Sequence, residues 1–354
     1  MTPHPTPSSL PGGETPPRTA PGSASGTAPG SGSAGTAGRP GPLNAGGDVL
    51  QVAGLSVRFR MGGGRHVEAV SDATFRLGPG ECLALVGESG CGKSVLASAL
   101  LGLLPGNAET AGSARLGDGL DLLAADEKTL ARTVRGRRVA LVPQSPAAHL
   151  TPVRTVRSHL EETVRELTAA DDPGGAAEAA AARAAFPESH LDHHPHQLSG
   201  GLAQRAATAL ALIGDAPLLL ADEPTTGLDR DLVERTVDEL RAHTRHAGRA
   251  LLMITHDLAA AQRVADTVAV MYAGRIVELA PADTFFAEPG PRHPYARGLL
   301  DALPERAFTP VPGTPPELGD LPPGCAFAAR CALADATCRT TRPPLTEGVA
   351  CHRA

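Results

Sequence analysis

The chain has 354 residues, which is enough for one large domain or two moderate ones, and its net charge is −6. This charge gives no overall attraction to nucleic acid or anionic lipid. The sequence has no Trp and only 3% aromatic residues, so its core must be built from Leu, Val and Ala. No apolar run approaches the ~18–20 residues of a membrane span, and the first residues lack a secretory signal pattern. We therefore expect a cytosolic protein that serves a membrane only by docking on a membrane partner.

The first 47 residues are almost entirely Pro, Gly, Ser, Ala and Thr. A segment of this composition cannot bury enough apolar surface to offset the entropy lost on ordering. We predict that residues 1–47 form a disordered tail.

Residues 49–52 and 55–59 are two short runs of strand type ahead of a Gly-rich turn, residues 67–77 form a strand after it, and residues 113–116 add another strand. Their apolar residues predict a small antiparallel sheet ahead of and beside the next motif. Phe59 stands where an aromatic ring could stack on the base of a nucleotide. Packing of Phe59 in the core is an equally good interpretation.

Residues 87–94, Gly-Glu-Ser-Gly-Cys-Gly-Lys-Ser, fit the phosphate-loop pattern G-x-x-x-x-G-K-[ST]. A buried-strand run precedes the loop and helix formers follow it, which is the context that the motif requires. Inward-facing N–H groups at a helix N-terminus bind phosphate, Lys93 is expected to reach the β- and γ-phosphates, and the Ser94 hydroxyl is expected to bind Mg²⁺. The sequence therefore predicts nucleoside triphosphate binding. The contacts expected in this segment are Gly87, Glu88, Ser89, Gly90, Cys91, Gly92, Lys93, Ser94 and Val95.

The buried strand 139–142 is followed by Gln144, whose amide is a candidate ligand of Mg²⁺ or of the attacking water. A Gln after a strand is more often an ordinary polar loop residue. Residues 155–167 and 176–185 then read as two helices of a small helical insert. Four histidines within residues 190–196 suggest a metal, but they straddle a proline, and a solvated loop is the better interpretation.

A second anion site is indicated by Leu198-Ser199-Gly200-Gly201, which opens a helix running to about residue 213. A Ser N-cap followed by two glycines leaves the first helical N–H groups bare.

Acidic residues end the next buried strand, 218–221. We expect Asp222 to hold Mg²⁺ through water and Glu223 to polarise the attacking water as general base. Asp229 then precedes a helix, and the buried strand 250–255 ends at His256, which could contact a γ-phosphate. A hairpin over residues 267–279 completes a nucleotide-binding unit.

Taken in order, these motifs resemble those of the ATP-binding subunits of ABC transporters, and the resemblance covers residues 49–354. The set comprises the phosphate loop, the Q-loop Gln144, the signature from Leu198, the Asp222-Glu223 strand end, the D-loop ending at Asp229 and the switch His256. The C-terminal motifs resemble the dipeptide, oligopeptide and nickel import branch. These motifs are His293-Pro294-Tyr295, Gly298-Leu299-Leu300, Leu303-Pro304, Leu321 to Phe327, and Arg330-Cys331.

The resemblance implies an α/β fold: a P-loop NTPase core with an antiparallel β subdomain, a helical subdomain and a Cys-containing C-terminal extension. The implied boundaries are residues 48–280 for the ATP-binding domain, about 145–200 for the helical subdomain and 281–354 for the extension. Two subunits sandwich ATP head to tail, so that nucleotide on Lys93 meets Ser199 and Gly201 of the partner subunit.

By the same resemblance, the chain hydrolyses ATP to power uptake of peptides, or of nickel or metal chelates. The implied partners are a second ATP-binding subunit, expected to be a paralogue, two membrane permease subunits and an extracytoplasmic substrate-binding protein, with no nucleic acid. The implied location is the cytoplasmic face of the cell membrane. The alternative is a soluble non-transport ATPase of the same type, although such proteins usually carry two cassettes or an inserted coiled coil.

Six cysteines are present. Cys82 and Cys91 are expected to be free thiols, with Cys91 exposed beside Lys93 and open to oxidation. The other four lie in the last 30 residues: Cys325, Cys331, Cys338 and Cys351. Disulfides are disfavoured in the cytosol, and the usual C-x₂-C spacing of zinc sites is absent. The resembling subunits carry this motif and some bind a 4Fe–4S cluster, so a structural cluster is favoured, with zinc or free thiols as the alternatives.

The chain departs from the branch in three places. The stretch between Gln144 and Leu198 is short, which puts the docking geometry on the permease in doubt. Ala203 stands where Arg is usual, and His194 stands where Tyr is frequent.

Overall fold

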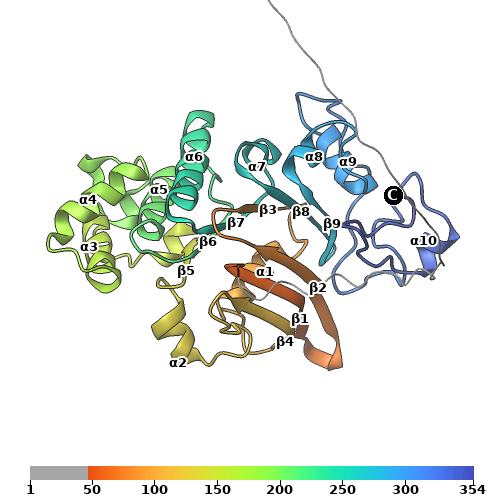
Figure 1. The fold of residues 1–354 in the computed structure, drawn as a ribbon, viewed down its shortest axis with the longest axis horizontal. Coiled ribbons are helices and arrows are strands. Elements are labelled where there is room, and N and C mark those ends of the chain that lie inside the picture. The colour runs from red at the N-terminus through yellow and green to blue at the C-terminus, as the bar shows by residue number, and fades with distance from the viewer. Residues whose placement is uncertain (1–46) are drawn as a thin grey trace, which may run out of the picture. The chain divides into compact units, whose positions relative to one another are not determined.

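The computed structural model describes residues 47–354, apart from the side chains of residues 246 and 247. The predicted disordered tail therefore lies outside the described residues, except for residue 47. Two β-sheets form the frame of the described part, and helices cover them (Figure 1).

The smaller sheet is antiparallel and has the order β2-β1-β4, as predicted. Its strands are β1 (Leu50–Arg60), β2 (His66–Leu77) and β4 (Ala108–Leu116). The sequence predicted two short runs where the structure has the single strand β1. The strand continues because Gly54, with a φ of 62°, absorbs a register shift within it.

The larger sheet has the order β5-β6-β7-β3-β8-β9. The first five strands are parallel and β9 is antiparallel to β8. The strands are β3 (Cys82–Val86), β5 (Val139–Val142), β6 (Leu218–Asp222), β7 (Ala250–Thr255), β8 (Thr267–Tyr272) and β9 (Arg275–Pro281). The predicted hairpin over residues 267–279 is confirmed. Its turn places Ala273 and Gly274 at positive φ, as a tight hairpin requires.

Helices fall into three groups along the chain. The group that flanks β3 to β5 comprises α1 (Lys93–Leu100) and the single turn α2 (Glu127–Thr129). The second group is α3 (Val156–Leu167), α4 (Pro173–Arg183) and α5 (Gly200–Ala211). The remaining helices are α6 (Arg230–Ala247), α7 (Leu258–Val264), α8 (Ala282–Phe286), α9 (Pro294–Asp301) and α10 (Ala336–Thr340).

The central strand β3 feeds both main hydrophobic cores, because successive side chains of a strand point to opposite faces. Leu83 and Leu85 pack toward α1 and the antiparallel sheet. Cys82, Ala84 and Val86 pack on the other side with residues of α6, α7 and α9. A third core joins α3, α4 and α5 and holds the helical group together.

No helix within residues 47–354 is long and apolar enough to cross a membrane. This finding concerns the described part of the chain alone.

Loss of a side chain from the central sheet should destabilise the protein strongly. Leu252 of β7 is 0% exposed in the core shared with β3. We expect Leu252→Ala to lower the free energy of unfolding by about 2–5 kcal/mol, measured by chemical denaturation. Leu103→Ala is the matched control, because Leu103 is 48% exposed, and it should change that free energy by less than about 0.5 kcal/mol. Equal losses in the two variants would contradict the assigned core.

Candidate functional site

Four neighbouring parallel strands deliver polar groups to one edge of the larger sheet. In spatial order β5, β6, β7 and β3 are followed by Gln144, by Asp222 and Glu223, by His256, and by the loop 87–94. Ligands of open parallel sheets bind at the carboxyl ends of the strands. Motifs up to 170 residues apart in sequence therefore share one edge.

The loop 87–94 needs glycine for steric reasons. A Cβ on Gly87 would lie 2.2 Å from the carbonyl oxygen of Met271, and a Cβ on Gly92 would lie 2.2 Å from that of Ala69. Gly92, with a φ of 107°, immediately precedes α1. The loop is therefore a backbone-lined cradle at a helix N-terminus, of the kind that binds anions. Ser89 and Gly90 are exposed at its rim.

Lys93 is folded into the loop rather than extended into solvent. Its side chain is buried, and Nζ donates to the carbonyl oxygens of Gly87 (2.7 Å) and Glu88 (3.2 Å). Both acceptors are neutral carbonyl groups, so these two contacts hold the ammonium at the loop without neutralising its charge.

Ser94 and Asp222 meet across the site, as a shared metal would require. The Ser94 hydroxyl donates to Oδ1 of Asp222 over 3.2 Å. Burial raises the pKa of the Asp222 carboxyl, although the Ser94 hydrogen bond opposes the rise. A cation placed here would offset the cost of that buried charge.

Glu223 and His256 form a direct pair. His256 Nδ1 donates to Oε2 of Glu223 over 2.7 Å, and this assigns the proton to Nδ1 because a carboxylate only accepts. Glu223 is buried at 6% exposure and takes a φ of 51°, which is unusual for a residue other than glycine. Its backbone N–H donates to Ile254 on the adjacent strand β7. His256 thus holds the carboxylate, and strand β7 holds the backbone of the same residue.

Three further residues predicted for the nucleotide site lie outside the pairs described above. Gln144 is exposed after β5, at the edge of the sheet. Val95 is partly buried in α1 and packs against the main core. Phe59 is partly buried in β1 against the same core, so its base-stacking role stays a prediction.

The signature residues lie on a different element from the loop. Ser199 caps α5 by accepting the N–H of Leu202, and Ser199 and Gly200 are exposed. A Cβ on Gly201 would lie 3.4 Å from the carbonyl oxygen of Gly227, so the signature adjoins the D-loop. Asp229 caps α6 in the same way through the N–H of Leu232. The N-cap residues of α5 and α6 are thus both exposed to solvent.

Two residues near the loop were missed as site residues by sequence reasoning. The hydroxyl of Tyr295, in α9, accepts the backbone N–H of Glu88 over 2.9 Å. Arg330 donates to both carboxylate oxygens of Glu88, over 2.7 and 2.9 Å. Both lie in motifs that marked the family branch, but nothing in their spacing indicates contact with a loop more than 200 residues away.

The predicted exposure of Cys91 is wrong. The Cys91 thiol is buried at 6% exposure, because the loop closes around it next to Gly87. Burial raises its pKa despite the nearby Lys93 ammonium. A buried thiol held in the neutral form is a poor target for oxidation.

The four C-terminal cysteines line one cavity. All six cysteines of the chain are unpaired. Between residues 47 and 354, no three His, Cys, Asp or Glu side chains are arranged as ligands of a single metal ion. The histidines of residues 190–196 are among the side chains that this finding covers.

Comparison with known families gives two matches on this chain. A model described as ABC transporter matches residues 70–226. A model described as the C-terminal region of oligopeptide/dipeptide transporters matches residues 277–338.

Similar proteins cover most of the chain. The oligopeptide transport ATP-binding protein of Mycobacterium tuberculosis is 39% identical over 321 residues, which are 86% of this chain and 51% of that protein. The chain thus spans about half the length of this mycobacterial relative. A Brucella melitensis protein described as a peptide import ATP-binding protein is 38% identical over 318 residues, 84% of this chain and 93% of that protein.

Solved structures confirm the predicted fold class. A dimeric bacterial ABC transporter cassette matches with a TM-score of 0.60 at 24% identity, covering 66% of this chain and 98% of that chain. An ATP-binding subunit of an ABC transporter matches with a TM-score of 0.52 at 26% identity, over 66% and 90%.

Proposed function

The chain belongs to the ATP-binding proteins of the oligopeptide and dipeptide ABC transporters, and we propose that it hydrolyses ATP to power peptide import. The observation that carries the proposal is the convergence of four motif-bearing strand ends on one sheet edge. The descriptions of the relatives support peptides as the cargo class. Nickel import and the soluble non-transport ATPase gain no support from these matches.

The residues at the sheet edge suit ATP and Mg²⁺. The loop 87–94 would receive the phosphates on its N–H groups, and Lys93 would exchange its carbonyl contacts for phosphate oxygens. Mg²⁺ takes oxygen ligands, and the Ser94 hydroxyl and Asp222 carboxylate already meet there. Gln144 would complete this set from β5. When bound, the metal would neutralise charge on the phosphates.

Glu223 is the group we assign as general base. Its carboxylate is buried and fixed by His256, so it can accept the proton of a water held against the γ-phosphate. His256 stabilises the orientation of that carboxylate through Nδ1, and its other ring nitrogen, Nε2, would be free to contact the nucleotide. His256 is 64% exposed at its side chain, which leaves that nitrogen accessible.

The site is one half of a shared site. Ser199, Gly200 and Gly201 lie at the start of α5, which is a different element from the loop that would hold the phosphates, and Ser199 and Gly200 are exposed. A second subunit would place its own signature over the loop 87–94, with Asp229 near the junction. We propose a pair of paralogous subunits bound to two permease subunits at the cytoplasmic face of the membrane, supplied by an extracytoplasmic binding protein.

We also propose a 4Fe–4S cluster in the cavity of the four C-terminal cysteines. Four thiols line this one cavity, and four thiolates are the ligand set of a 4Fe–4S cluster, in which each thiolate binds a separate iron. His293 lines the same cavity. Its Nδ1 accepts the N–H of Tyr295, so its buried Nε2 carries a proton and has no acceptor in the described residues. Cluster sulfides would provide one.

Removal of the assigned base separates hydrolysis from binding. Glu223→Gln should lower ATP turnover by about 10²- to 10⁴-fold, because the amide cannot accept a proton from water. Binding of ATP should remain. Phosphate release and equilibrium nucleotide binding measure the two properties, and Glu305→Gln, at an exposed position, should leave both unchanged. Full residual turnover in Glu223→Gln would remove Glu223 from this role.

Protein purified without oxygen should contain iron and acid-labile sulfide and should absorb visible light. Cys331→Ser should lose both, whereas Cys82→Ser should keep them, because Cys82 is buried in β3 outside the cavity. Zinc without visible absorption would contradict the cluster.

A further inference from the structure

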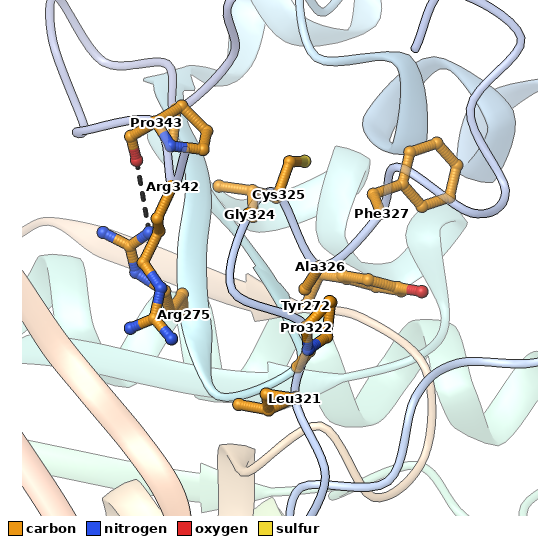
Figure 2. A pocket seen from close by; sticks show the side chains of 13 residues that line it. Tyr272, Arg275, Leu321, Pro322, Gly324, Cys325, Ala326, Phe327, Arg342 and Pro343 are labelled. Atoms are coloured by element: carbon orange, nitrogen blue, oxygen red, sulfur yellow. Dashed lines mark hydrogen bonds between the residues drawn. The ribbon is translucent and has the colours of Figure 1, made fainter. Parts of the chain in front are cut away.

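The C-terminal extension lies against the phosphate loop. Residues 315–319 form one wall of a cavity whose other wall includes residues 88–91 of the loop and Val67 of β2. Farther along, residues 321–327 run across Tyr272 and Arg275, where β8 turns into β9 (Figure 2). Arg275 Nη1 donates to the carbonyl oxygen of Pro343 over 3.2 Å (Figure 2). The extension is therefore anchored on both strands beside the loop.

Arg330 of this extension forms an ion pair with the loop. Its two terminal nitrogens donate to the two carboxylate oxygens of Glu88, and Nη1 also donates to the Tyr272 hydroxyl over 3.2 Å. The guanidinium lies 5.6 Å from the ring centres of both Tyr272 and Phe327. Its side chain is only 4% exposed. A planar group with two parallel hydrogen bonds and two ring contacts is held in one position.

Glu88 is consequently fixed at three of its groups. Arg330 holds the carboxylate, Tyr295 holds the backbone N–H, and Lys93 holds the carbonyl oxygen. Two of these three partners lie C-terminal to the nucleotide-binding unit. The conformation of the loop thus depends on residues outside the motif.

The carboxylate of Glu88 also raises an electrostatic problem. Like charges repel most strongly where solvent is excluded, and the loop is built to receive a polyanion. An uncompensated carboxylate at this position would oppose phosphate binding. Arg330 offsets that charge, and its burial makes the compensation less sensitive to salt.

We propose that Arg330 is a positioning residue of the nucleotide site, which neutralises Glu88 and fixes the loop 87–94 for phosphate binding. Arg330 stands directly beside Cys331, and Cys325 lies five residues before it. Nucleotide binding and ordering of the four-cysteine extension are therefore coupled through one ion pair, and the coupling acts equally in both directions. This inference rests on the proposed ATP-binding function.

The test is equilibrium titration of the full chain with a fluorescent ATP analogue in the absence of Mg²⁺. Arg330→Ala should weaken binding by about 10- to 100-fold, because it leaves a carboxylate unpaired beside the phosphates. Arg330→Lys keeps the charge but loses the paired hydrogen bonds, so its loss should be smaller. The double variant Glu88→Gln with Arg330→Ala should recover most of the affinity, because the repelling charge is gone. A purely structural role of Arg330 would give no such recovery.

Arg157→Ala is the matched control. Arg157 also forms ion pairs, in its case with Glu178 and Asp192, but it lies in the helical group and is partly exposed. Its removal should leave nucleotide affinity unchanged. Wild-type affinity in Arg330→Ala, or failure of the double variant to recover, would overturn the inference. Absence of binding by the unaltered chain would instead overturn the proposed function.

Discussion

The chemistry proposed for this protein depends on the hydrogen-bonded order of four parallel strands, β5, β6, β7 and β3. Each strand is short and almost fully buried, so its position is fixed by packing on both faces. The backbone that delivers the polar residue after each strand then has little freedom. The buried strands therefore fix the positions of the site residues, and the loops add the remaining groups of the site.

Little space is left around the backbone of the loop 87–94. Carbonyl oxygens from β2 and β8 stand where a side chain on Gly92 or Gly87 would point. The backbone of the loop is consequently pressed against both sheets of the protein. Movement of either sheet would be transmitted to the phosphate site, as the proposed coupling of ATP hydrolysis to a permease would need.

Local sequence patterns were sufficient for the strands of the larger sheet and for the order of the motifs, because buried runs and glycine turns act over a few residues. Sheet irregularities were harder to anticipate. Gly112 packs against the backbone of Gly54, and β4 extends beyond the predicted residues 113–116. The burial of Cys91 and the pairing of Arg330 with Glu88 could not be predicted from local patterns. Both depend on contacts between segments that are far apart in the sequence. A residue spacing carries no signal for a contact between an acid and an arginine 242 residues apart.

That separation has a consequence for the synthesis of the protein. A ribosome adds ~5–20 residues per second, so roughly 10–50 seconds pass between the appearance of the loop and that of Tyr295 and Arg330. During this interval the nascent chain carries the whole phosphate motif without two of the groups that hold Glu88. Cellular ATP is present throughout translation, yet it meets a loop with all of these contacts only after Arg330 has been added. Maturation of the site therefore waits for the C-terminal extension.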